Sequence, residues 1–372
     1  MLLIPGPVEV PYSVLNASTY LDNHRSGKFK EIMAENKEML NAISGAYASV
    51  MVTGSGTLAV ESMVFSLIDK SKKVLSISFG DFGERLIKSI KRKTINVEYV
   101  NYEKPDPEAI LNDIKERDFD YLFLVHNETS NGTALYNIKE ILQIVKDKGA
   151  RLLVDDVSGF GGYDFTMDGI YAMATSSQKN LASVPGIAII FLSKDAYNYL
   201  MENEINDVPF YLDLKTSLKF LDKNETAYTP AMGIFNSLNV ALKILKREGM
   251  ENRINRIQKS AEFIRKKLIE NNVSIFGDIK TYSNTVVCFY NGDNNSIINK
   301  LGQENIIVSK GMGKISGNTI RIGTMGVINK TYVQKFLNSY FKATGNETII
   351  DENEIPKDTE LPDFIYNDIN LN

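Results

Sequence analysis

Residues that build disulfides and metal sites are scarce in this chain. Its 372 residues include one cysteine, Cys288, and two histidines, His24 and His126. One cysteine excludes an internal disulfide framework and a multi-cysteine metal site, and two histidines do not favour a histidine-based zinc site. Cys288 lies in the apolar segment 286–289, so we expect it to be an inert thiol in the core. No bound metal is expected.

Long apolar runs and basic runs are also missing. No segment approaches the length of a membrane span, and Pro5, Gly6 and Pro7 interrupt the N-terminus too early for a signal peptide. The net charge is only −4, so neither nucleic acid nor an anionic membrane is an expected partner. The sequence therefore predicts a soluble protein of the cytoplasm.

The composition suits a large domain with a smaller one beside it. Apolar residues make up 43% of the chain, which is ample for two cores. Strand and helix patterns alternate from about residue 30 to 200, and this order predicts an α/β fold with a mostly parallel sheet covered by helices. The expected strands are 47–52, 74–77, 121–125, 151–155 and 187–192, and the expected helices are 57–68 and 138–145.

The pattern changes after about Pro230. Two long helices followed by short strands predict a smaller α+β domain. From Ala343 the chain is acidic and has little periodicity, so we expect a tail with partial order at best. The helices are expected at 235–245 and 254–268, and the strands at 285–289 and 319–322. The predicted organisation is an N-terminal arm (1–15), a large domain (16–240), a small domain (241–342) and the tail (343–372).

Two residues carry most of the chemical information. Lys179 follows residues 176–178 in a polar turn between apolar strands, and a lysine there is a candidate Schiff-base former. Asp155 ends a preceding strand and is a candidate partner for a pyridinium nitrogen. Together they suggest pyridoxal 5′-phosphate (PLP), an electron sink held on a lysine with an acid at its ring nitrogen. The neighbouring Asp156 is an alternative partner for the ring nitrogen, but strand alternation favours Asp155.

Other segments offer groups for a flat, anionic cofactor. Residues 54–57, Gly-Ser-Gly-Thr, lie between a strand and a helix, where backbone N–H groups and two hydroxyls suit a phosphate. The same turn fits a dinucleotide fingerprint through Ala59, but the next strand ends without the acid that a ribose requires. Phe82 follows that strand and is placed to stack on a ring. The turn 126–132 offers further hydroxyls.

Arg321 is a cation within the apolar strand expected at 319–322. A buried guanidinium needs an anion, and its planar fork suits a carboxylate. Two interpretations are therefore open, a substrate carboxylate and a structural salt bridge.

Taken in order along the chain, these segments resemble one family. The chain is similar to the class V branch of the fold-type I PLP-dependent aminotransferases, most of all to the serine–pyruvate and alanine–glyoxylate group, over about residues 3–342. The resemblance is carried by Pro5-Gly6-Pro7, His24-Arg25-Ser26 with Phe29, Gly54-Ser55-Gly56-Thr57, the Phe82 segment, Glu128-Thr129-Ser130, Asp155 with Val157, Ser177-Gln178-Lys179 and Arg321-Ile322-Gly323.

The resemblance implies a role for each position. Lys179 would carry PLP and shuttle the substrate's α-proton, and Asp155 would bond the ring nitrogen. Arg321 would bind the substrate carboxylate, with Gly6 beside the substrate. The remaining cofactor contacts would be Phe82 and Val157 on the two ring faces, Thr129 near the ring edge, and Ser55, Gly56, Thr57 and Gln178 on the phosphate.

The resemblance also implies a homodimer with shared active sites, because Thr229 would reach the phosphate of the neighbouring subunit. Two positions differ from the family pattern. Phe82 stands where tryptophan is common, and this chain has no tryptophan. Thr226, three residues before Thr229, stands where tyrosine is common.

The implied activity is transfer of an amino group from alanine or serine to pyruvate or glyoxylate by a ping-pong mechanism. The nearest alternative is a 2-aminoethylphosphonate–pyruvate transaminase, which residues 3–7, 54–61 and 158–162 also resemble. A cysteine desulfurase-type lyase needs a cysteine on a mobile loop, which Cys288 does not provide. A non-catalytic PLP-binding protein is the last alternative, and the intact set of Lys179, Asp155 and Arg321 argues against it.

Overall fold

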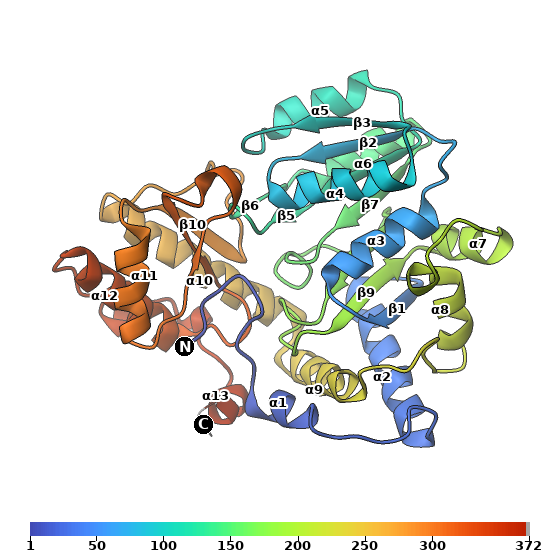
Figure 1. Cartoon of the computed structure of the whole chain (residues 1–372). Coiled ribbons are helices and arrows are strands. Elements are labelled where there is room, and N and C mark those ends of the chain that lie inside the picture. Colours follow the sequence, from blue (N-terminus) through green and yellow to red (C-terminus); the bar gives the residue numbers. More distant parts are fainter. Residues whose placement is uncertain (370–372) are drawn as a thin grey trace.

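Two sheets of different size organise the chain (Figure 1). The structure is a computed structural model, and it describes residues 1–369. The larger sheet belongs to the first two thirds of the chain and the smaller one to the last third. Each sheet has its own core of buried apolar side chains.

The larger sheet has seven strands in the order β1-β9-β8-β7-β4-β2-β3. Strand β9 is antiparallel to both of its neighbours, and the other neighbouring pairs are parallel. The predicted mostly parallel sheet is therefore confirmed. Its strands are β1 (Ala48–Thr53), β2 (Val74–Ser78), β3 (Val97–Asn101), β4 (Tyr121–Val125), β7 (Arg151–Asp155), β8 (Ala172–Ser176) and β9 (Ile187–Leu192).

Helices pack along this sheet because each carries an apolar stripe. In α4, for example, Leu86, Ile87 and Ile90 are buried whereas Lys88 and Arg92 face solvent. Helix α3 contacts β8 and β9, α4 contacts β2, and α2 and α8 contact β1. The helices are α2 (Gly27–Ser44), α3 (Gly56–Leu67), α4 (Asp81–Lys93), α5 (Pro107–Glu116), α6 (Ile138–Asp147), α7 (Lys194–Glu202) and α8 (Leu214–Leu221).

The smaller sheet has three antiparallel strands in the order β10-β12-β11. Alternation divides its residues, so that Val287 and Ile322 belong to the small core. Their neighbours Cys288 and Arg321 are cross-strand partners on the opposite face. The elements are β10 (Val286–Tyr290), β11 (Ser309–Lys310), β12 (Thr319–Gly323), α10 (Met250–Glu270), α11 (Asn294–Gln303) and α12 (Lys330–Thr344).

The two parts of the chain meet at Gly249. Helix α9 (Met232–Glu248) packs on α1 (Tyr12–Ala17) and α2, and α10 starts directly after Gly249, whose φ is +87°. That φ favours glycine, so the chain can turn sharply there. The boundary expected between residues 240 and 241 lies inside α9, and the change of direction comes at its end.

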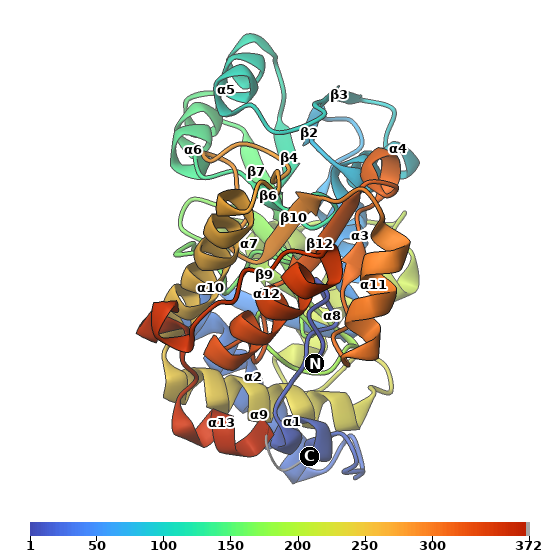
Figure 2. The same ribbon diagram turned by 90° about the vertical axis from the view of Figure 1, so that its left-hand side faces the viewer.

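The acidic tail differs from the expected partly ordered segment, because residues 343–369 pack against the body of the protein. Its buried side chains are Ile350, Ile355, Leu361 and Ile365. They are too widely spaced among acidic residues to show a helical or strand period. Helix α13 (Asp363–Ile369) ends beside α1, where Ser13 Oγ donates a hydrogen bond to Asp368 Oδ2 at 2.5 Å (Figures 1 and 2). The rest of the predicted tail, 370–372, lies outside the described residues.

The N-terminal arm crosses from the small sheet to the large one. Leu3 N–H donates to the Ile307 carbonyl, and Gly323 N–H donates to the Leu3 carbonyl, both at 2.9 Å. Val8 N–H then donates to the Gln178 carbonyl at 3.2 Å. The arm therefore passes directly over the turn that contains Lys179. In residues 1–369, no helix is long and apolar enough to span a membrane.

Candidate active site

A cavity of about 230 Å³ opens where the parallel strands end. Asp155 is the last residue of β7, and Lys179 follows β8 by a short turn. The carboxyl ends of parallel strands share one edge of the sheet, which is where α/β folds bind ligands. Most of the predicted site residues line this cavity. They are Gly6, Ser55, Gly56, Thr57, Phe82, Thr129, Asp155, Val157, Gln178 and Lys179.

Lys179 is held beneath the N-terminal arm. Its Nζ donates a hydrogen bond to the Pro5 carbonyl, and a Cβ added to Gly6 would lie 2.7 Å from Nζ. Burial, and next the positive charge of Arg321, lower the pKa of the Lys179 ammonium to about 8, although Asp155 opposes this shift. A substantial fraction of this amine is therefore neutral near physiological pH, which is the form that attacks a carbonyl carbon.

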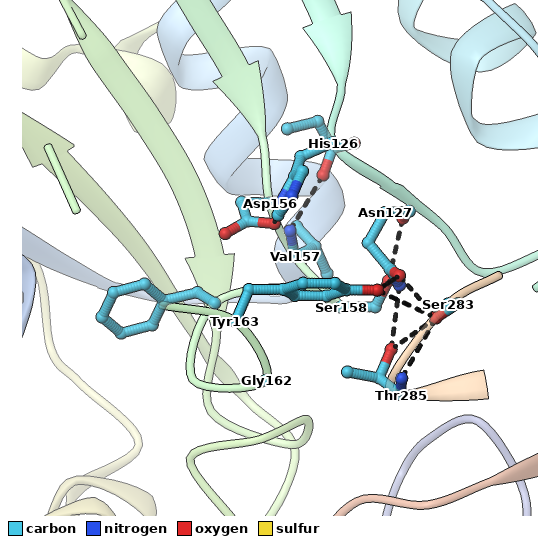
Figure 3. A network of polar contacts seen from close by, with 12 residues as sticks. His126, Asn127, Asp156, Val157, Ser158, Gly162, Tyr163, Ser283 and Thr285 are labelled. Atoms are coloured by element: carbon cyan, nitrogen blue, oxygen red, sulfur yellow. Dashed lines mark hydrogen bonds and ion pairs between the residues drawn. The ribbon is translucent and has the colours of Figure 1, made fainter. Parts of the chain in front are cut away.

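The side chains of Asp155 and Asp156 lie in different surroundings. The Asp155 Oδ1 accepts a hydrogen bond from Val157 N–H at 3.1 Å, and burial raises the pKa of this carboxyl to about 7. A cation in the cavity would favour its ionised form. Asp156 is completely buried outside the cavity, where its Oδ1 lies 2.7 Å from His126 Nδ1 (Figure 3).

The start of α3 has the features of an anion site. Ser55 occupies the N-cap position, yet its hydroxyl caps no backbone group, so it is free for a ligand. A Cβ on Gly56 would lie 2.6 Å from Val157 Cγ1, so only glycine leaves this approach open. Nearby, Gln178 Oε1 and Ser176 Oγ are buried without a hydrogen-bond partner within residues 1–369. Helix N–H groups, two hydroxyls and an amide suit the phosphate of PLP.

Phe82 is positioned by the carboxylate of Glu128. Glu128 is fully buried and accepts hydrogen bonds from Gly83 N–H at 3.1 Å, Ser130 N–H at 3.0 Å and Ser130 Oγ at 2.6 Å. These bonds hold the first turn of α4, and with it Phe82, at the cavity wall. Of the hydroxyls expected in the turn 126–132, that of Ser130 is therefore used inside the protein. The Thr129 hydroxyl donates to Ser158 Oγ at 2.6 Å.

Arg321 does not line the cavity itself but lies directly behind it. Its Nε donates to the Lys310 carbonyl at 2.8 Å, and Nη1 donates to the Thr129 carbonyl at 2.7 Å. Within residues 1–369, no carboxylate lies within 4.0 Å of this guanidinium, so the structural salt bridge considered from the sequence is not formed in that part of the chain. The Nη2 group makes no hydrogen bond to the described residues.

Thr229 is the one predicted cofactor contact that does not line this cavity. It is exposed and lines a separate hollow with Tyr211, Tyr228 and residues 50–53. Within one chain, the structure does not bring Thr229 to Ser55 and Gly56. Its predicted contact with a partner subunit stays a prediction.

Sequence reasoning missed six of the residues that line the cavity, among them Arg85 and Asn127. Arg85 lies three positions after Phe82 on α4, and its guanidinium is 4.6 Å from the Phe82 ring centroid. That helical spacing was a usable signal. Asn127 had no comparable signal, because its partners come from segments more than 30 residues away along the chain.

Asn127 joins the large domain to the small one (Figure 3). Its Oδ1 accepts hydrogen bonds from Tyr163 OH at 2.7 Å and Ser283 Oγ at 2.6 Å. Its Nδ2 donates to Ser158 Oγ at 2.7 Å and Thr285 Oγ1 at 2.9 Å. Ser158 also accepts from Thr129, whose carbonyl binds Arg321. One amide therefore satisfies four groups and links the cavity floor to the start of β10.

Comparison with known proteins decides the family. The family description "Aminotransferase class-V" matches residues 12–328. The chain is a class-V aminotransferase. It is 34% identical to an uncharacterized aminotransferase of Methanocaldococcus jannaschii over 346 residues, which covers 90% of this chain and 89% of that protein. The residues that line the cavity therefore belong to a transaminase.

Two further comparisons give one relative by structure and one by sequence. The fold matches an alanine–glyoxylate aminotransferase of Nostoc sp. with a TM-score of 0.86 at 25% identity, covering 92% of this chain and 94% of that one. A 2-aminoethylphosphonate–pyruvate transaminase of Rhizobium meliloti is 28% identical over 262 residues, which covers 67% of each chain. The fold-type I architecture predicted from the sequence is confirmed by the structural match.

The first prediction concerns the pH dependence of Lys179. We expect the rate at which PLP attaches to the PLP-free enzyme to rise with pH and to level off above about pH 8, because the neutral amine is the nucleophile. An ordinary lysine would keep gaining up to about pH 10. Stopped-flow absorbance over pH 6–10 measures the midpoint.

Two variants check the cause of this shift. Arg321→Met removes a charge that lowers the Lys179 pKa, so the midpoint should rise. Asp155→Asn removes a charge that raises it, so the midpoint should fall. A midpoint near 10 in the unmodified enzyme, or shifts of the same sign in both variants, would contradict the assignment.

The second prediction concerns the Asn127 network. Asn127→Ala removes the partner of four buried groups, and unsatisfied buried groups cost about 1–3 kcal/mol each. Because the hydroxyls can partly reorganise, we expect the free energy of unfolding to fall by about 2–4 kcal/mol in urea titrations. The exposed Asn203→Ala is the matched control and should change it by less than about 0.5 kcal/mol. Equal effects of the two changes would refute the role of the network.

Proposed function

We propose that this class-V aminotransferase uses PLP to move an amino group from a small amino acid, alanine or serine, to a small 2-oxo acid, pyruvate or glyoxylate. The observation that carries the proposal is the buried Lys179 amine, which shares one cavity with Asp155 and the free N-terminus of α3. These three features supply a nucleophile, a partner for a ring nitrogen and a phosphate site. The two half-reactions would follow one another in a ping-pong mechanism.

Bound PLP would supply an electron sink for the charge that develops on the substrate's α-carbon. The protein residues bind, orient and move protons. Lys179, once its amine is free, is placed to take up and return the α-proton, because its lowered pKa suits both directions. Asp155 would stabilise a proton on the ring nitrogen, and Phe82 and Val157 would hold the ring between them.

Arg321 would bind the carboxylate that donor and acceptor share. Its Nε and Nη1 groups are fixed by the carbonyls of Lys310 and Thr129, so the guanidinium is held in place before the substrate arrives. A guanidinium prepared in this way loses little freedom when it binds a carboxylate. Gly6 would lie against the substrate, because it already contacts Lys179.

The second candidate is 2-aminoethylphosphonate as the amino donor. The relative from Rhizobium meliloti favours it, and Arg321 would then have to bind a phosphonate. A lyase that uses a reactive cysteine is not favoured. Cys288 is buried in β10, and burial raises the pKa of its thiol to about 12, far from the range of a nucleophilic thiolate.

The third prediction tests the substrates. The PLP-loaded enzyme is mixed with single amino donors, and the change in cofactor absorbance reports each half-reaction. We expect alanine and serine to react, and pyruvate and glyoxylate to reverse the change. Efficient reaction of 2-aminoethylphosphonate together with no reaction of alanine or serine would overturn the proposal in favour of the second candidate.

Arg321→Lys sharpens the same test. It keeps the charge but loses the two-pronged geometry, so the KM for donor and acceptor should both rise about tenfold or more, with PLP still bound. Arg92→Lys, at an exposed position of α4, is the matched control. A higher KM for only one of the two substrates would mean that Arg321 does not bind the shared carboxylate.

The fourth prediction concerns the subunits. We propose a homodimer in which Thr229 contacts the partner's cofactor phosphate. Around Thr229 the surface carries exposed aromatic rings, with Phe210 74% and Tyr211 41% exposed, which is typical of a surface that pairs. We expect light scattering to give the mass of a dimer at assay concentration.

A variant at the expected interface completes this test. Thr229→Ala should raise the Kd for PLP, whereas Thr344→Ala, at an exposed position at the end of α12, should not. A fully active monomer would refute the dimer, and equal effects of the two variants would refute the role of Thr229. The cytoplasmic location also stays a prediction, which cell fractionation would test.

A further inference from the structure

One charged group in the cavity has no role in the proposed reaction, and that group is Arg85. Its side chain lines the cavity and is exposed to solvent. Within residues 1–369, no carboxylate lies within 4.0 Å of it. Its described contact is the Phe82 ring, 4.6 Å away. This contact orients the guanidinium at the cavity wall and leaves its N–H groups without an anion.

The charges around the cavity do not balance once each proposed role is assigned. The cationic groups are Lys179, Arg85 and, directly behind the wall, Arg321, whereas Asp155 is the one carboxylate among the residues that line the cavity. Asp155 would face the ring nitrogen, and Arg321 would face the α-carboxylate. The phosphate would lie at the start of α3, where it has its own donors. Arg85 is left as a cation that a substrate can reach.

Acidic groups near Arg85 do not neutralise it directly. Asp81 and Glu84 share its helix, and Glu128 is buried below the first turn with its oxygens occupied by hydrogen bonds. The charge of Arg85 is felt inside the cavity, because it opposes protonation of both Asp155 and Lys179. An anion bound at Arg85 would therefore lie within electrostatic reach of the reacting centre.

We infer that Arg85 is a specificity-determining residue that binds a second, distal oxyanion of the substrate. The inference rests on the proposed function and extends its substrate class to acidic amino acids and their oxo acids. Arg321 would hold the α-carboxylate, and Arg85 would hold a distal carboxylate or phosphonate through a two-pronged hydrogen-bonded pair. Aspartate is the simplest donor with this chemistry.

The experiment measures binding without turnover. Succinate and propionate are matched ligands of similar length, with two carboxylates and one, and neither has an amino group to transfer. Their affinities for the PLP-loaded enzyme are measured by the change in cofactor absorbance or fluorescence. We expect succinate to bind about tenfold or more tightly than propionate, as one charge-assisted pair allows.

Variants at Arg85 assign the difference to this residue. In Arg85→Met, the ratio of the two affinities should fall toward one, and Arg85→Lys should retain part of it. Arg92→Met, also exposed on α4, is the matched control and should keep the full ratio. A third ligand, 3-phosphonopropionate, separates a distal phosphonate from a distal carboxylate. Preference for it over succinate, lost in Arg85→Met, would also support Arg85 as the anion site.

Two results would overturn the inference. Equal affinity for succinate and propionate in the unmodified enzyme would mean that no second anion is bound. Loss of PLP affinity in Arg85→Met with an unchanged ligand ratio would assign Arg85 to the cofactor phosphate. Neither result bears on whether alanine reacts, and failure of every donor in the half-reactions leaves these affinities measurable. The two proposals therefore fail separately.

Discussion

The site depends on taking one amine out of water. An ammonium group that is buried loses part of its hydration. This loss lowers its pKa, so the neutral amine becomes accessible. Here the N-terminal arm covers Lys179, and the positive charge of Arg321 behind the cavity adds to the effect of burial. Burial has the opposite effect on the pKa of Asp155 in the same cavity. It raises this pKa, so the protonated acid becomes accessible near neutral pH. Each group is poised to change its protonation state when a charged partner arrives.

The sequence revealed the parts of the fold that are buried on both faces. Residues 121–125, 151–155 and 187–192 are short apolar runs, and each became a central strand. Strands β3 and β8 were missed for different physical reasons. β3 lies at the edge of the sheet, and its side chains are exposed or half-buried, so it shows no apolar run. β8, Ala-Met-Ala-Thr-Ser, has small side chains that give little pattern.

The site likewise contains residues whose place the sequence could predict and contacts that it could not. The lysine, the acid and the phosphate turn follow one another along the chain in a specific order, so their common location could be foreseen. The partners of Asp156 could not, because His126 lies 30 positions away and its ring is fixed by packing against Tyr163 and Phe165. Asp155 and Asp156 are consecutive, so alternation at the end of β7 directs the Asp155 side chain into the cavity and the Asp156 side chain behind it. Side-chain chemistry alone does not distinguish them.

The N-terminal arm has a consequence for the order in which the protein can be completed during synthesis. Leu3 is synthesised before its partners Ile307 and Gly323, which follow it by more than 300 residues along the chain. The start of the arm therefore lacks these two partners until the small sheet has been made, although Val8 can already bond Gln178. Complete closure of the arm over Lys179 therefore depends on the last third of the chain.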